Sequence, residues 1–255
     1  MQQLTIVKVG GKVVENPDLL EDFLKNYNLI AGYKILVHGG GRSATDLAEK
    51  LGIETVMKEG RRITDAEMLK VVTMVYAGLV NKNIVAQLQK LRIDAIGLTG
   101  ADMNLILSEK RPVKEIDYGF AGDVKKVNAN ALLDLINQNY LPVIAPITHD
   151  GKGFLLNTNA DTIAGEIAKA MSFDYNVRLI YCFEKRGVLL NETDEESIIP
   201  ILNFELYQEY KKEGVIKGGM IPKLDNAFQA IAAGVKEVII SQASDVKTGK
   251  GTILK

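Results

Sequence analysis

The stretch Lys8-Val9-Gly10-Gly11-Lys12-Val13, which follows the apolar run 4–7, is the most informative part of this chain. The apolar run predicts a buried strand, and Lys8 then lies at the end of that strand. The glycine pair lets the backbone approach a ligand closely, so that its N–H groups contact oxygen atoms. A cation beside bare N–H groups suits phosphate, although a glycine pair after a strand is also a common turn.

A second glycine loop follows the next expected strand, 34–38, in the sequence Ile35-Leu36-Val37-His38-Gly39-Gly40-Gly41-Arg42. Two such loops at the ends of two strands strengthen the prediction of a phosphate or anion site. Neither loop spells G-x-G-x-x-G or the P-loop sequence G-x-x-x-x-G-K-[ST]. The sequence therefore disfavours a dinucleotide dehydrogenase and a P-loop enzyme.

Bulk properties narrow the class of protein. The 255 residues suffice for one large α/β unit or two lobes, and the net charge of −1 gives no reason to expect a nucleic-acid partner. We see neither a signal-peptide pattern nor an apolar run of about 18 residues, so we expect no membrane partner. The single Cys182 excludes an internal disulfide and fits a reducing compartment. A cytoplasmic protein is the resulting expectation.

Strand-like and helix-like segments alternate along most of the chain. Such repeated βα units predict an α/β fold with a mainly parallel sheet covered by helices on both faces, and ligands at the carboxyl ends of its strands. Pro17 is expected to open a helix, Thr64 to cap a long helix that ends near Leu91, and residues 103–128 to form an inserted hairpin. Strands are expected at 4–7, 34–38, 95–98, 141–147, 154–156, 177–183 and 238–241, with 252–254 as an edge strand, and helices at 42–51, 130–137, 160–171, 204–212 and 223–233. We place a boundary between two lobes after residue 172.

The loops of this chain offer cations, N–H donors and one carboxylate, but no nucleophile paired with a base. His38 and His149 are the only histidines, and they suggest neither a Ser–His–Asp triad nor a metal site. We therefore expect no metal ligands from the protein.

Five motifs in order resemble the N-acetylglutamate kinase family of the amino-acid kinase superfamily. They are Lys-x-Gly-Gly at 8–11, His-Gly-Gly-Gly at 38–41, Gly-x-Arg-x-Thr at 60–64, Asn-x-Asn-Ala-Asp at 157–161 and Gly-Met-x-x-Lys at 219–223. The resemblance spans nearly the whole chain. It implies a three-layer αβα sandwich in which lobe 1–172 binds the acyl-amino acid and forms a homodimer, while lobe 173–255 binds ATP.

The resemblance also implies a reaction, in which the γ-phosphoryl group of ATP moves to the side-chain carboxylate of an N-acylated glutamate, on the arginine pathway. Lys8 and Lys223 would flank the transferring group, and Asp161 would orient both lysines. Gly40, Gly41, Arg62 and Asn157 would bind the acid substrate. Gly10, Gly11, Lys185, Gly187 and Gly219 would contact the nucleotide, with Mg²⁺ carried on the ATP phosphates.

The chemistry of these residue types fits that reaction independently of the resemblance. A carboxylate nucleophile is ionised at neutral pH, so the site needs no general base and must instead position two anions and stabilise charge.

Each of these residues also has a plainer structural interpretation. Lys8 could be a solvated strand end, the glycines could form ordinary turns, and Arg62 could be a surface charge. Asn157, Asn159 and Asp161 could serve only to begin a helix.

The sequence departs from the family pattern in two places. Residues 182–189 read Cys-Phe-Glu-Lys-Arg-Gly-Val-Leu, where the family has a Ser/Thr–Asp pair before a Gly-containing turn. Lys185 or Arg186 could replace those contacts by facing phosphate, or both could be solvated loop charges. Arg61 stands where the family usually has leucine, and a second arginine there could meet the extra carboxylate of a succinyl group.

Three functions stay open at this point. The first is a kinase for N-acetyl- or N-succinyl-glutamate, the second a kinase for another small acid, and the third an inactive nucleotide or amino-acid sensor.

Arginine-inhibited family members carry an additional N-terminal helix that builds a hexamer. Met1 lies too close to the first strand for such a helix, so we expect a homodimer, with the helix at 65–91 as its face.

Overall fold

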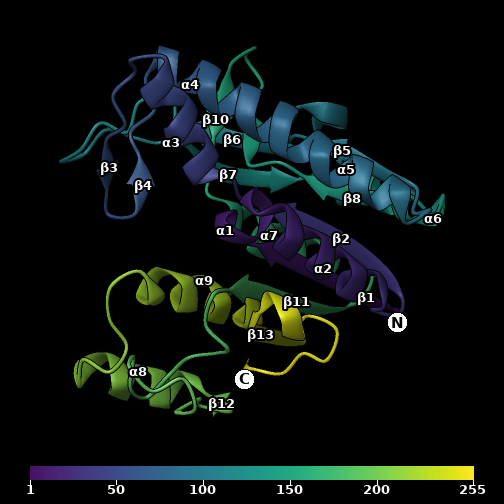
Figure 1. Ribbon diagram of the computed structural model, residues 1–255, viewed down its shortest axis with the longest axis vertical. Coiled ribbons are helices and arrows are strands. Elements are labelled where there is room, and N and C mark those ends of the chain that lie inside the picture. Colours follow the sequence, from purple (N-terminus) through teal and green to yellow (C-terminus); the bar gives the residue numbers. More distant parts are fainter.

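The computed structural model describes residues 1–255 and is built around an eight-stranded sheet in the order β12-β14-β13-β11-β1-β2-β8-β5 (Figure 1). Every neighbouring pair is parallel except β13 with β14. The predicted α/β class with a mainly parallel sheet is confirmed. The strands are β1 (Gln3–Val9), β2 (Tyr33–His38), β5 (Ala95–Leu98), β8 (Leu141–Ile144), β11 (Asn176–Phe183), β12 (Ile201–Leu202), β13 (Glu237–Gln242) and β14 (Thr252–Leu254).

Strand β1 lies in the middle of this sheet, between β2 and β11. In register, Lys8 lies opposite Tyr181 of β11 and Val37 of β2, and Val9 lies opposite Cys182 and His38. The carboxyl ends of the three strands therefore meet at one edge. The glycine loops after β1 and β2 begin side by side there, which is where open parallel sheets bind ligands.

Helices cover both faces of the sheet and give three layers. Alternate residues of β1 enter different cores: Leu4 and Ile6 pack with α6, α7, α8 and α9, whereas Val7 and Val9 pack with α2, α3, α4 and α5. This alternation produces the predicted αβα sandwich. The helices are α1 (Gly11–Glu15), α2 (Pro17–Asn28), α3 (Gly41–Lys50), α4 (Ala66–Val72), α5 (Asn81–Lys90), α6 (Ala129–Asn137), α7 (Ala160–Met171), α8 (Phe204–Lys212) and α9 (Met220–Ala232). Two short 3₁₀ turns complete them, at Asp102–Asn104 and Ala243–Asp245.

Two smaller sheets flank the main one. A four-stranded sheet contains β6 (Ile106–Lys110), β7 (Gly122–Val127), β9 (Ile147–His149) and β10 (Leu155–Asn157). Its antiparallel β6–β7 pair is the inserted hairpin predicted for 103–128. A short antiparallel ribbon is formed by β3 (Met57–Lys58) and β4 (Arg61–Arg62), at the left of Figure 1.

Two strand predictions need correction. The expected strand 141–147 divides, because β8 ends at Ile144 and the chain leaves the main sheet to form β9 in the smaller one. At the break, Pro146 has no N–H to donate, and its carbonyl accepts from the backbone N–H of Thr158 at 3.0 Å. Strand β14 is not the edge of the main sheet, because the two-residue β12 pairs along its outer side.

The helix starts follow side-chain capping. Asn16 caps α2 by accepting from the N–H groups of Asp18 and Leu19, both at 3.0 Å, as the Asn-Pro-Asp sequence predicts. The predicted cap at Thr64 is wrong, because Asp65 caps α4 by accepting from Met68 N–H at 2.8 Å. Thr64 is instead held in an isolated bridge, exchanging backbone hydrogen bonds with Tyr118 and Phe120. Its hydroxyl donates to the carbonyl of Arg62.

A π-helix, Thr73–Val80, joins α4 to α5 in one continuous rod. Buried side chains recur along the rod at intervals of four residues, at Met68, Val72, Tyr76, Val80, Ile84 and Leu88. Four residues of a regular α-helix turn through about 400°, so such a stripe would drift by about 200° over five intervals. The wider π turn takes up part of this drift and keeps the stripe facing the core.

By length and composition alone, the rod Ala66–Lys90 is the one helix apolar enough to cross a membrane. Its buried side chains belong to the hydrophobic core beneath it, which accounts for its apolar character.

Candidate active site

Lys8, the penultimate residue of β1, forms an ion pair with Asp161 in the first turn of α7. The Lys8 Nζ lies 2.8 Å from the Asp161 Oδ1, and each side chain is only 10% exposed. Asn159 begins α7 by accepting from the N–H groups of Asp161 and Thr162, so the cap directs the first turn of this helix toward the end of β1. Two opposite charges therefore share a nearly enclosed position at the middle of the sheet edge.

Lys223 reaches the same place from the first turn of α9. Its Nζ lies 3.6 Å from the centroid of the Phe183 ring, at the end of β11, and the Nζ of Lys8 lies 5.4 Å from that centroid. The two lysines, distant in sequence, thus converge over one aromatic face. Burial lowers the pKa of Lys223, and the nearby Lys8 lowers it further, while Asp161 and Glu184 raise it. No ion pair joins Lys223 directly to Asp161.

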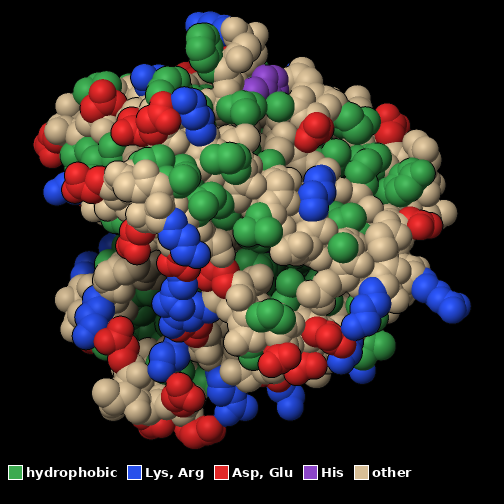
Figure 2. All heavy atoms as spheres, turned by 45° about the horizontal axis from the view of Figure 1, so that its top comes forward, with side chains coloured by type: hydrophobic (Ala, Val, Ile, Leu, Met, Phe, Trp, Pro, Cys, Tyr) green, Lys and Arg blue, Asp and Glu red, His purple; other side chains and the backbone are tan.

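Both lysines line a cavity of about 340 Å³, which we call the lysine cavity. Of the predicted nucleotide residues, Gly10, Gly11, Lys185 and Gly187 line it, whereas Gly219 does not. Lys185 forms an exposed ion pair with Glu195 at 3.1 Å. Figure 2 shows a hollow on the left of the molecule with Lys and Arg side chains around it. The lysine cavity therefore offers cations and backbone N–H groups to an anion.

A second cavity, of about 200 Å³, contains the predicted acid-binding residues, and we call it the arginine cavity. Its lining is drawn from six separate regions of the chain: Gly39, Gly40, Gly41, Met57, Gly60, Arg61, Arg62, Tyr76, Ala121, Gly122, Pro146, Asn157, Thr158, Asn159 and Ala160. Gly40, Gly41, Arg62 and Asn157 are thus brought together. The lining combines two arginines and the polar side chains of Asn157, Thr158 and Asn159 with five glycines.

Arg62 is held rigidly in the arginine cavity. One terminal nitrogen, Nη2, donates to the carbonyl of Gly41 at 2.7 Å and to the Thr45 hydroxyl at 2.9 Å. The other, Nη1, donates to the Thr55 hydroxyl at 3.2 Å. Asn157 is fixed similarly, because its amide donates to the Thr64 hydroxyl at 2.9 Å. These contacts fix both side chains in place at the cavity wall, and a guanidinium group is the cation that pairs best with a carboxylate.

The two cavities are neighbours. Gly39 N–H donates to the carbonyl of Val9 at 3.0 Å, which ties the second glycine loop to the first. The start of α7 links them again, since Asn157 lines the arginine cavity and Asp161, four residues later, pairs with Lys8 of the lysine cavity. Two anions bound in these cavities would meet near the Lys8–Asp161 pair. No group of three or more His, Cys, Asp or Glu side chains is arranged to hold a metal ion.

Three residues near the site were assigned no role in it from the sequence alone. Phe183 supplies the ring under both lysines, and Tyr76 lines the arginine cavity from the π-helix. His38 lies fully buried behind the glycine loop, where its Nδ1 contacts the Gly39 carbonyl at 2.7 Å and its Nε2 contacts the Asn81 amide at 3.1 Å. Burial lowers the pKa of His38 to about 4, so the ring is neutral at pH 7. The only available signals were the four-residue period that includes Tyr76 and the position of His38 before three glycines.

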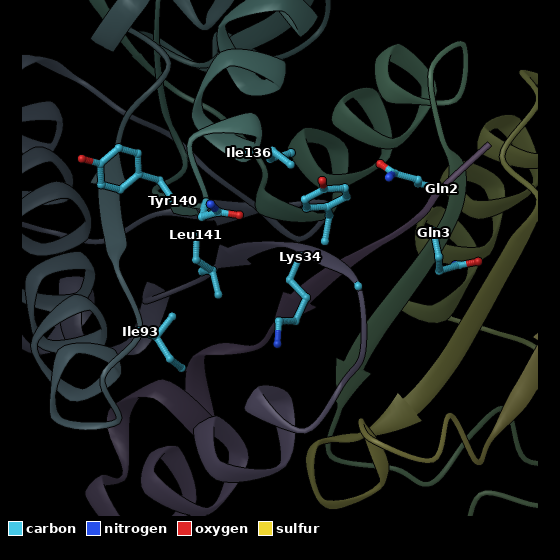
Figure 3. Close-up of a pocket in the computed structure, with 10 residues that line it drawn as sticks. Gln2, Gln3, Lys34, Ile93, Ile136, Tyr140 and Leu141 are labelled. Carbon is cyan, nitrogen blue, oxygen red and sulfur yellow. The ribbon is translucent and has the colours of Figure 1, made fainter.

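A cavity of about 470 Å³ lies at the opposite edge of the sheet (Figure 3). Gln3, Tyr33 and Leu141 line it from the first residues of β1, β2 and β8, and none of the predicted site residues does. Lys34 in this cavity donates to the carbonyls of Asn28 and Ile30 at the end of α2, which gives its ammonium group a structural role. The lysine and arginine cavities are therefore the candidates for chemistry.

Known proteins resemble this chain in sequence and in fold. The model of the amino acid kinase family matches residues 3–242. An acetylglutamate kinase from Parabacteroides distasonis is 63% identical over 252 residues, covering 99% of both chains. Among solved structures, smu.665 from Streptococcus mutans UA159 has a TM-score of 0.82 at 25% identity, covering 99% of this chain and 98% of that one. Carbamate kinase from Giardia lamblia, bound to AMP-PNP, shares the fold with a TM-score of 0.71 at 13% identity, covering 99% of this chain and 98% of that one.

Proposed function

The chain belongs to the amino acid kinase family, and we propose that it is an acetylglutamate kinase, which transfers the γ-phosphoryl group of ATP to the side-chain carboxylate of N-acetylglutamate in arginine biosynthesis. The products are ADP and an acyl phosphate. The structural observation that supports this most directly is the convergence of the Lys8 and Lys223 ammonium groups beside Asp161. This arrangement fits phosphoryl transfer between two anions.

The lysines act on charge rather than on protons. The acceptor carboxylate is already ionised at pH 7, so its oxygen attacks phosphorus directly and the ADP oxygen leaves. Lys8 and Lys223 would each face an oxygen of the transferring group and offset the negative charge there. Asp161 holds Lys8 by the 2.8 Å ion pair and influences Lys223 only at longer range. Asp161 would therefore position Lys8 directly and affect Lys223 much less.

The lysine cavity would bind ATP. Gly10 and Gly11 would present backbone N–H groups to phosphate, and Lys185 and Gly187 also line the cavity. Gly219 would act through its place at the start of α9, whose first turn carries Lys223. Mg²⁺ would ride on the ATP phosphates, because the protein offers no carboxylate cluster for it. Lobe 173–255 would thus supply the nucleotide contacts, together with Lys8 and the first glycine loop.

The arginine cavity would bind the acid within lobe 1–172. Arg62 would take the α-carboxylate of N-acetylglutamate as a charged pair, and Asn157 would hydrogen-bond the substrate. Gly40 and Gly41 would offer N–H groups beside it. Gly40 has a φ of 153°, and a side chain there would meet the Tyr76 ring at 3.1 Å, so this position requires glycine.

The presence of Arg61 favours a second possible substrate, in which a succinyl group replaces the acetyl group. It lines the arginine cavity beside Arg62 and forms no ion pair, while the nearby Asp123 is paired with Arg111. Burial lowers the pKa of Arg61, and the neighbouring Arg111 lowers it further. An unpaired guanidinium group at this wall would favour a substrate with an additional carboxylate, such as N-succinylglutamate.

We also propose a cytoplasmic homodimer. The rod Ala66–Lys90 exposes Met74 and Leu79, at 53% and 56%, on either side of Gly78, and a second copy of the chain would cover this strip. Sedimentation should give twice the monomer mass, and a stable hexamer would refute this assembly. The buried, unpaired Cys182 and the use of ATP are consistent with the cytoplasm.

Trapping the product tests the proposed reaction. The protein is incubated with ATP and a panel of acids, namely N-acetylglutamate, N-succinylglutamate, glutamate, aspartate and carbamate, and then treated with hydroxylamine. N-acylated glutamate should consume ATP and give a hydroxamate, because hydroxylamine captures an acyl phosphate. Turnover only with another acid would indicate a different kinase of this family. No turnover with any of them would leave the sensor as the better explanation.

A further inference from the structure

We propose that Tyr76 is a substrate-binding residue, whose hydroxyl donates a hydrogen bond to the carboxylate that Arg62 holds. This inference rests on the proposed function and extends it to a residue on the π-helix. It concerns the arginine cavity only.

The surroundings of Tyr76 differ between its ring and its hydroxyl. The side chain is 6% exposed, and its ring packs so closely on the glycine loop that a Cβ at Gly40 would lie 3.1 Å from its Cδ1. No protein atom accepts a hydrogen bond from this hydroxyl, although the Arg62 guanidinium lies close enough to donate one to its oxygen. The hydroxyl oxygen is also not among the fully enclosed polar atoms. Because Tyr76 lines the arginine cavity, the remaining accessible part of this side chain faces that cavity.

Arg62 is the charged group that acts most strongly on this hydroxyl. Burial raises the pKa of Tyr76, while the Arg62 guanidinium lowers it by proximity, and Glu15 raises it slightly. The phenol therefore keeps its proton at pH 7 and acts as a donor. A carboxylate bound by Arg62 would lie within the reach of a second, uncharged donor, and such charge-assisted hydrogen bonds are the stronger kind.

The π-helix is what brings Tyr76 to this position. Tyr76 belongs to the four-residue stripe with Val72 and Val80, which a regular helix would turn progressively away from the core. π-helical turns are rare and frequently mark functional sites. Here the irregular turn presses the Tyr76 ring onto Gly40 while the hydroxyl stays free to donate.

Core packing alone does not require this hydroxyl. Phenylalanine would fill the same space, and a buried hydroxyl without a partner costs free energy. Tyr27 offers the comparison within this chain, because its hydroxyl is fully enclosed and unpartnered on α2 in the same hydrophobic core, outside both cavities.

Tyr76→Phe, with Tyr27→Phe as the matched control, tests the proposal. Tyr76→Phe should raise the KM for N-acetylglutamate about 10- to 100-fold, which corresponds to one hydrogen bond to a charged group. The KM for ATP and the melting temperature should stay close to those of the wild type. Tyr27→Phe should leave both KM values unchanged.

A truncated substrate shows which oxygen the hydroxyl meets. 4-Acetamidobutanoate keeps the reacting carboxylate and the acetyl group but lacks the α-carboxylate. Tyr76→Phe should lower kcat/KM for N-acetylglutamate and leave kcat/KM for 4-acetamidobutanoate, measured at high concentration, unchanged. An equal loss for both substrates, or no loss for either, would overturn the proposal. If the wild type itself formed no acyl phosphate from N-acetylglutamate, the proposed function would fail first.

Discussion

The Nζ of Lys8 and the Oδ1 of Asp161 lie 2.8 Å apart at the middle of the sheet edge, although 153 positions separate the two residues in the chain. The pair joins the end of β1 to the first turn of α7, between the lysine and arginine cavities. Its charges cancel locally, so the net positive charge offered to an incoming phosphate comes mainly from Lys223. Asp161 thereby sets the direction in which Lys8 points.

Replacing Asp161 with asparagine should lower kcat by about 10²-fold, because Lys8 would lose its fixed position near the transferring group. It should also lower the free energy of unfolding by about 3–5 kcal/mol, since a nearly buried ammonium group would lose its partner. Hydroxamate formation and urea denaturation measure the two effects. Glu166→Gln is the control on the same helix: its pair with Lys169 is partly exposed, so it should cost less than about 1 kcal/mol and leave kcat unchanged.

Replacing Lys223 with methionine should lower kcat by about 10²–10³-fold with no loss of stability. Burial places the pKa of Lys223 below its usual 10.5, so the charged form is disfavoured in the folded protein. Between these two pKa values the unfolded chain binds more protons, and the wild type therefore gains free energy of unfolding as the pH rises through that window. Urea denaturation measured between pH 8 and 10.5 should show a smaller increase in the free energy of unfolding with pH for Lys223→Met than for the wild type. A large loss of stability at pH 7 would contradict this account.

Replacing Arg61 with leucine should alter the choice between acyl groups. If Arg61 meets a succinyl carboxylate, the variant should lose about tenfold or more in kcat/KM for N-succinylglutamate and little for N-acetylglutamate. Arg62→Leu should lower both values, because Arg62 would hold the α-carboxylate that the two substrates share. A clear preference of the wild type for N-acetylglutamate would end the succinyl proposal.

His38 should make stability fall at acid pH. Burial lowers the pKa of His38 from 6.5 to about 4, so the unfolded chain takes up this proton first as the pH falls. The neutral His38 ring makes its full contribution to the free energy of unfolding above pH 6.5. This contribution, at most about 3 kcal/mol, is lost as the pH falls toward 4. Denaturation of His38→Asn across pH 4–7 should show a flatter slope than that of the wild type. An unchanged slope would mean that His38 binds its proton equally well in the folded and unfolded states.

Most of the fold was predictable from local signals. The alternation of apolar runs with capped helices predicted a mainly parallel sheet, and the Asn-Pro-Asp sequence at Asn16 predicted the start of α2. The predicted cap at Thr64 is wrong because a capping-box pattern describes only neighbours in sequence. A bridge to Gly119, more than fifty residues away, took the backbone groups of Thr64 and moved the cap to Asp65.

The site was predictable as a set of loops, and its arrangement was not. The sequence does not reveal the order of strands in the sheet. The position of Phe183 beside Lys8 and Lys223 depends on that order, because it requires β11 to lie next to β1. Tyr76 resembled an ordinary core residue of an apolar helix. Only the π turn, which depends on the packing of the whole stripe, directs it toward the glycine loop.

The central place of β1 has a consequence for how the chain is made. Its first partner, β2, emerges from the ribosome soon after it, but the other partner, β11, begins only at Asn176. At about 5–20 residues per second, translation leaves one side of β1 without its hydrogen-bonding neighbour for roughly 9–35 s. During that interval an apolar strand edge stands open to other nascent chains, which is the condition that favours aggregation. The same placement that puts Lys8 in the centre of the site thus leaves the unfinished polypeptide with an exposed strand edge until its last third has emerged.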